Sequence, residues 1–146
     1  MDSNDNLILV VEDNKASSDL MAYLLKAAGH TVLTCSDGAD AIAIASREHP
    51  RVIVMDLQLD RMSGLEAAAV LAADPRLKAI PRVAVTAYAM VGDRDRVLKA
   101  GFQGYIAKPI EPTTFAAQIK AFFVPATLRP SEPPRSPQSP RGSNGA

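Results

Sequence analysis

The sequence predicts an α/β fold in which five strands form one parallel sheet with helices on both faces. Two observations carry this prediction. Five short, mostly apolar runs alternate along the chain with segments of helical periodicity. Runs that lack a polar residue at every second position are typical of parallel strands, which are buried on both sides. The expected strands are Leu7–Val11, Thr31–Cys35, Val52–Met55, Arg82–Ala87 and Gly104–Ala107.

Each expected strand is followed by an expected helix. In the first helix Leu20, Leu24 and Ala28 recur every four residues, with Met21 and Leu25 beside them, which predicts a core-facing stripe. The first and the fourth expected helices are each followed by a glycine, which is typical of a helix C-terminus. The expected helices are Lys15–Ala28, Ala39–Glu48, Gly64–Ala73, Val91–Ala100 and Thr113–Phe123, and the two glycines are Gly29 and Gly101.

The composition of the chain changes at Pro125. The last 22 of the 146 residues contain six of the eleven prolines and almost no large apolar side chain. Such a segment buries too little surface to offset the entropy of ordering it. We therefore expect one domain over residues 1–124 and a disordered tail rich in Pro, Ser and Arg over residues 125–146.

Composition also excludes several classes of protein. The single cysteine, Cys35, excludes an internal disulfide and a cysteine-based zinc site, and it is expected to be a small buried side chain on a strand. The net charge of zero gives no support for bulk binding to DNA or to acidic membranes. Acidic residues at the N-terminus and the short apolar runs predict a cytoplasmic protein without a membrane span.

Polar side chains follow four of the expected strands at their carboxyl ends. These ends meet at one edge of an open α/β sheet, where ligands bind, so the side chains should lie close together. Taken alone, Asp13 could be a helix N-cap and Lys108 an ordinary surface lysine. The set comprises Glu12 and Asp13 after the first strand, Asp56 after the third, Thr86 at the end of the fourth, and Lys108 with Pro109 after the fifth.

This set of side chains favours metal-assisted phosphoryl transfer. Clustered carboxylates repel one another unless a cation compensates their charge, and oxygen ligands select a hard ion such as Mg²⁺. With the ion bound, Asp56 becomes a nucleophile toward a phosphoryl group. Lys108 and the Thr86 hydroxyl then stabilise the transferred oxygens. The chain has no Walker loop and no GxGxxG turn, which disfavours nucleotide binding.

Five motifs in this order resemble response-regulator receiver domains, over the whole body to about Phe123. They are "VEDN" after the first strand, "MD" ending the third, "TA" after the fourth, and "YIA" with "KP" at the fifth. The stretch from Thr86 to Ile110 looks like stand-alone, DivK-type regulators and the receiver modules of hybrid histidine kinases. The resemblance implies a flavodoxin-like, doubly wound (βα)₅ sheet with strand order 2-1-3-4-5.

The resemblance also implies a role for each site residue. Asp56 would be phosphorylated by a phosphohistidine donor. Asp13 would bind Mg²⁺ directly and Glu12 mostly through water, with the backbone carbonyl of Gln58 as a further ligand. Thr86 and Lys108 would contact the phosphoryl group, and the Lys108–Pro109 bond would be cis, an uncommon geometry in folded proteins.

The family further implies a switch that changes protein binding. Thr86 would move toward the phosphoryl group, and the Tyr105 ring would turn from an exposed to a buried position. The face made by the fourth helix, the fifth strand and the fifth helix would then change its affinity for a downstream protein. The expected partners are a histidine kinase or a histidine phosphotransfer protein and that downstream target, with no direct contact to DNA or membrane. An aromatic that only packs on an edge strand is the other interpretation of Tyr105.

Three alternatives are weighed beside this hypothesis. The chain could pass its phosphoryl group on to a histidine phosphotransfer protein. The sequence does not distinguish this phosphate shuttle from the switch. It could be a constitutive binding module, but that would predict loss of a site residue, and none is missing. A metabolic phosphatase would need a second Asp two residues after the nucleophile, whereas this position is Gln58.

Asp60 departs from the family, which usually has proline there. Aspartate frees φ in the loop and adds negative charge near the site. The hypothesis is that Asp60 slightly raises the Mg²⁺ affinity or slows the approach of an anionic donor.

Overall fold

The computed structural model describes residues 6–59, 62–87 and 93–123. Its centre is one five-stranded sheet in the order β2-β1-β3-β4-β5, in which every neighbouring pair is parallel. The predicted α/β class and strand order are confirmed. The strands are β1 (Leu7–Val11), β2 (Thr31–Cys35), β3 (Val52–Met55), β4 (Arg82–Thr86) and β5 (Gly104–Ala107).

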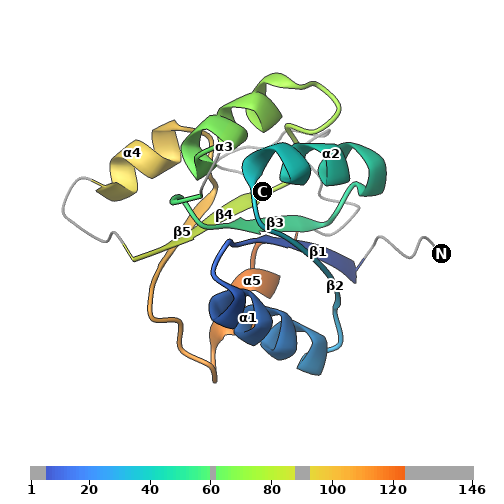
Figure 1. The fold of residues 1–146 in the computed structure, drawn as a ribbon, viewed down its shortest axis with the longest axis vertical. Helices are drawn as coiled ribbons and strands as arrows, with labels where there is room; N and C mark the ends of the chain where they lie inside the picture. The colour runs from blue at the N-terminus through green and yellow to red at the C-terminus, as the bar shows by residue number, and fades with distance from the viewer. Residues whose placement is uncertain (1–5, 60–61, 88–92, 124–146) are drawn as a thin grey trace, which may run out of the picture.

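Helices cover both faces of this sheet (Figure 1). α1 and α5 pack on one face, and α2, α3 and α4 pack on the other. The helices are α1 (Lys15–Ala27), α2 (Gly38–Glu48), α3 (Gly64–Ala73), α4 (Asp93–Lys99) and α5 (Phe115–Lys120). No helix in these described ranges is long and apolar enough to cross a bilayer.

The central strands explain the continuous apolar runs of the sequence. Every residue of β1, β3 and β4 is buried, because side chains on both faces meet helices. In β1, Leu9 and Val11 point into the core under α2, α3 and α4, whereas Ile8 and Val10 point into the core under α1 and α5. The central strands thus contribute side chains to both hydrophobic cores, one on each face of the sheet.

The buried side of α1 differs from the predicted stripe. Met21, Ala22 and Leu25 are buried, but Leu20 is 41% exposed. The helix carries two adjacent apolar stripes, and packing against the sheet selects the one centred on Met21 and Leu25. Leu20 lines a surface groove beside Pro109 instead.

Several helix ends differ from the predicted ones. α1 ends at Ala27 rather than Ala28, and α4 ends at Lys99 rather than Ala100. The first predicted residues of α4 lie outside the described ranges. α5 ends at Lys120, and the next residues form a tighter turn in which Phe122 and Phe123 donate three residues back. Gly29 and Gly101 have φ values of 97° and 111°, so glycine does occupy the left-handed position after α1 and α4. The predicted tail and Asp60 lie outside the described residues.

Candidate functional site

The sheet places Glu12 and Asp56 next to each other. β1 and β3 pair with Val11 opposite Met55, so the two acids follow as neighbours at the carboxyl edge. Their backbones continue the ladder by one residue: Glu12 N donates to the Cys35 carbonyl over 3.0 Å, and Asp56 N donates to the Val11 carbonyl over 3.0 Å. Both carboxylates therefore start from fixed backbone positions.

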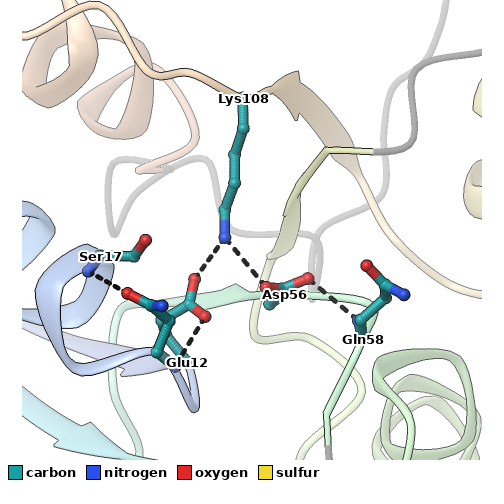
Figure 2. Close-up of polar contacts among 6 residues, drawn as sticks. Glu12, Ser17, Asp56, Gln58 and Lys108 are labelled. Atoms are coloured by element: carbon teal, nitrogen blue, oxygen red, sulfur yellow. Dashed lines mark hydrogen bonds and ion pairs between the residues drawn. The ribbon is translucent and has the colours of Figure 1, made fainter.

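β4 and β5 deliver the other two expected groups to the same edge. Thr86 pairs with Ala107 and is fully buried, and its carbonyl accepts from Lys108 N at 2.9 Å. The Lys108–Pro109 peptide bond is cis, the geometry that the resemblance implies. Figure 2 shows the Lys108 side chain extended toward both carboxylates.

Lys108 bridges the two acids. Its Nζ lies 2.7 Å from Glu12 Oε1 and 3.0 Å from Asp56 Oδ2. The Glu12 side chain is only 1% exposed and that of Asp56 only 10%, so both charges are removed from water and need this partner. The ammonium group therefore compensates the negative charge of both carboxylates.

Burial and pairing act in opposite directions on the charged groups. Burial raises the pKa of Glu12, more than the hydrogen bond from Lys108 lowers it. Burial lowers the pKa of Lys108, but the bonds to Glu12 and Asp56 outweigh it and leave that pKa raised. The lysine is therefore held as an ammonium ion.

The remaining carboxylate oxygens are bound by backbone amides. Asp56 Oδ1 accepts from Gln58 N at 2.9 Å, and Glu12 Oε2 accepts from Asn14 N at 3.1 Å. The Asn14 side chain in turn caps α1 by accepting from Ser17 N at 2.9 Å. Asn14 received no role from the strand-end pattern, although an Asn before a helical pattern is an N-cap signal.

The acidic residues form a set that fits a hard divalent cation. Carboxylate oxygens of Glu12, Asp13 and Asp56 lie within 4.8 Å of one another. The set is oxygen-only and carries more negative charge than one lysine compensates, which suits Mg²⁺ rather than a softer ion. Asp13 is half-buried and faces a hollow of about 270 Å³ that Thr34 and Cys35 also line. The residues present therefore fit the implied metal ion.

The other predicted residues lie around this centre. The Gln58 side chain is exposed, and its backbone reaches the site through the bond to Asp56. Tyr105 is half-buried and packs against the core under α2, α3 and α4. Cys35 is half-buried rather than fully buried, and burial raises the pKa of its thiol to about 12, which leaves it unreactive.

An apolar groove adjoins the site on the side of α1. It has a volume of about 140 Å³ and lies next to the Lys108 stem. Leu20, which lines the groove, is 41% exposed, and Tyr23, three residues further along α1, is 68% exposed. The groove is lined by Ser17, Leu20, Met21, Lys108, Pro109 and Ile110.

Comparison with known proteins agrees with this geometry. The family profile described as "Response regulator receiver domain" matches residues 8–120. The polar-differentiation response regulators DivK of Brucella ovis and Brucella abortus are 39% identical over 116 residues, which cover 80% of this chain and 94% of theirs.

Solved receiver domains have the same fold. The receiver domain of a sensor histidine kinase from Pseudomonas aeruginosa, with a magnesium ion coordinated in its active-site cleft, is 30% identical with a TM-score of 0.75, covering 81% of this chain and 97% of that one. The receiver domain of a histidine kinase from Syntrophus aciditrophicus is 25% identical with a TM-score of 0.74, covering 81% of this chain and 89% of that one.

Proposed function

The chain belongs to the family of response-regulator receiver domains, the signalling modules of two-component systems, and on this premise we propose that Asp56 is its phosphoacceptor. The observation that carries the proposal is the position of Lys108. Its ammonium group lies within hydrogen-bond distance of both Glu12 and Asp56. Asp56 is the more accessible of the two carboxylates, with 10% of its side chain exposed against 1% for Glu12. A cation fixed beside it can stabilise the oxygens of a phosphoryl group transferred to it.

In the proposed reaction an Asp56 oxygen attacks the phosphorus of a phosphohistidine donor. The new bond is P–O, the bond that breaks is P–N, and the histidine nitrogen keeps the electron pair. Lys108 exchanges its contact with the Asp56 carboxylate for one with the phosphoryl oxygens. The Thr86 hydroxyl donates to another of these oxygens. We propose that phosphorylation and dephosphorylation of Asp56 are the chemistry of the chain.

We assign the Mg²⁺ ligands to the acidic set. Asp13 and Asp56 would bind the ion directly, Glu12 mostly through water, and the Gln58 carbonyl would add a backbone ligand. The close approach of the three carboxylates supports this assignment. When bound, the ion neutralises charge on the transferred oxygens and orients them.

The donor is inferred to be a protein that docks on the apolar groove beside Lys108. This groove and the exposed Leu20 and Tyr23 offer an apolar surface within reach of Asp56. A histidine on the surface of a helix could approach Asp56 while its apolar neighbours cover α1. Histidine kinases and histidine phosphotransfer proteins are the partners of this kind that the family implies.

The output is inferred to be altered protein binding at the face formed by α4, β5 and α5. Tyr105 lies on β5, which pairs with β4, the strand that carries Thr86. A shift of Thr86 toward the phosphoryl group would therefore act on the strand next to Tyr105. Phosphorylation would bias this surface between two arrangements.

The test is labelling with a small donor. Acetyl phosphate and Mg²⁺ should add one phosphoryl group to the full chain, as measured by intact mass, and Asp56→Asn should abolish the label. Asp19→Asn removes a carboxylate that is exposed and paired with Lys15, so it should label like the wild type. Labelling of Asp56→Asn at the wild-type level would contradict the assignment.

A further inference from the structure

The loop that follows Asp56 is closed by the first residue of α3. Gly64 N donates to the Leu57 carbonyl over 3.0 Å, and Gln58 N donates to Asp56 Oδ1 over 2.9 Å. The Leu57 and Leu59 side chains are buried in the core beneath. The first residue of α3 is therefore hydrogen bonded to the segment that carries Asp56.

Gly64 has no space for a side chain. A Cβ added there would lie 2.5 Å from the Asp56 carbonyl oxygen and 2.8 Å from Leu57 Cα. Both atoms belong to the backbone, so neither can turn aside as the end of a side chain can. Among the described residues the glycines with positive φ are Gly29 and Gly101, so Gly64 is not required for a left-handed backbone. Close approach is the reason for glycine at this position.

The first turn of α3 is held in place on the side of this contact. It is fixed by a capping box, in which Glu66 N donates to Ser63 Oγ over 3.1 Å and Ser63 N donates to Glu66 Oε1 over 3.0 Å. Ala67, Ala68 and Leu71 then anchor the helix in the core. A side chain at position 64 would thus displace the loop more readily than the helix.

We propose that Gly64 is a positioning residue for the phosphoacceptor: by contact with the backbone of Asp56 and Leu57 it fixes the direction of the Asp56 carboxylate and of the Gln58 backbone before any ion binds. The inference rests on the proposed function, because it gives Gly64 a role toward the Mg²⁺ ligands. It adds to the site a residue that contacts neither the metal ion nor the phosphoryl group.

The test compares the full-length variants Gly64→Ala and Gly101→Ala. Gly101→Ala forces alanine into a left-handed φ of 111° but meets no residue of the site, and its nearest contact is Ala72 Cβ at 3.4 Å. Gly101→Ala should lower the melting temperature and leave Mg²⁺ affinity, measured by calorimetry, unchanged. Gly64→Ala should weaken Mg²⁺ binding roughly 10- to 100-fold, the effect typical of losing a group that orients the metal ligands without touching the ion.

A wild-type Mg²⁺ affinity in folded Gly64→Ala would overturn the inference. If Gly64→Ala does not fold, hydrogen exchange of the wild type decides. The Gly64 amide should be protected in EDTA as strongly as the β3 amides, and rapid exchange there would overturn the inference. A wild type that neither binds Mg²⁺ nor accepts label would instead count against the proposed function, so the two failures are distinguishable.

Discussion

At the scale of single residues, Lys108 is the side chain that links the two buried acids of the site. It is the cation that bonds both Glu12 and Asp56, and all three side chains are largely removed from water. Taking away the lysine leaves two neighbouring carboxylates that repel each other. The lysine is thus a structural counter-ion before it can be a contact for a phosphoryl group.

We predict that Lys108→Ala still folds but loses about 1–3 kcal/mol of unfolding free energy at neutral pH in EDTA. Mg²⁺ should recover more stability in this variant than in the wild type, because the ion then has no competing ammonium group. Urea unfolding with and without Mg²⁺ measures both effects. The control is Lys15→Ala, whose ion pair with Asp19 is exposed and should be worth less than about 0.5 kcal/mol. Equal losses in the two variants would contradict the bridging role.

His30 gives the protein a pH-dependent stability that is separate from the site at the carboxyl edge. Its Nδ1 is hydrogen bonded to Asn6 Oδ1 over 2.6 Å, and its ring meets the Phe123 ring edge-on with centroids 5.2 Å apart. Burial, and then the positive charge of Lys120, lowers the pKa of His30 below its ordinary value of 6.5. The unfolded chain therefore binds this proton more tightly than the folded one.

We predict that the contribution of His30 is fully present above about pH 6.5 and is lost as the pH falls from there through the lower pKa of the folded state. In urea unfolding, the free energy of unfolding should fall with falling pH across this range in the wild type. It should fall less in His30→Gln. His49, the other histidine of the chain, is exposed, and His49→Asn should keep the slope. A slope that survives in His30→Gln would disprove the assignment.

At the scale of elements, α1 shows where sequence patterns reach their limit. Periodicity predicted the helix and its end at Gly29, and it placed Met21 and Leu25 in the core-facing stripe, where both are buried. It also placed Leu20 there, although Leu20 is 41% exposed. Both stripes satisfy the same spacing, and only contact with the sheet separates them. The exposure of Leu20 leaves an apolar residue beside the site, which an amphipathic pattern alone would not reveal.

We predict that Leu20→Ser slows phosphotransfer from a phosphohistidine protein roughly fivefold to tenfold, as for loss of a central interface residue. Labelling by acetyl phosphate should not change, since the small donor needs no docking surface. Val70→Ser on α3 is the matched control, because Val70 is 45% exposed on the other face of the sheet. A slower reaction with both donors would mean that Leu20 supports the site itself rather than the docking of a protein.

The loop between β3 and α3 shows a second limit. Strand ends alone predicted that Glu12, Asp56 and Lys108 meet, because parallel strands share one carboxyl edge. Gly64 was expected only as the start of a helix, because a glycine that permits close backbone contact looks like any other glycine in a sequence. Its role depends on which segment lies against it, and that is a property of tertiary packing.

At the scale of the whole molecule, the sheet accounts for both the fold and the site. Buried apolar strands hold two helical layers together, and the same strands bring carboxylates, a hydroxyl and an ammonium group to one edge. The apolar runs predicted the strands and the parallel sheet, and the family resemblance implied their order. The exact helix ends could not, since α5 ends in a tight turn set by the contacts of Phe122 and Phe123 rather than by its own periodicity.

The central claim, that Asp56 is the Mg²⁺-dependent phosphoacceptor, is tested most directly by mapping the acyl phosphate. The full chain is incubated with acetyl phosphate in Mg²⁺ or in EDTA, reduced with borohydride, which converts a phosphorylated aspartate into homoserine, and digested for peptide mass spectrometry. We predict homoserine at position 56 alone, and only with Mg²⁺. Homoserine at another aspartate with Asp56 unmodified, or equal modification in EDTA, would contradict the account.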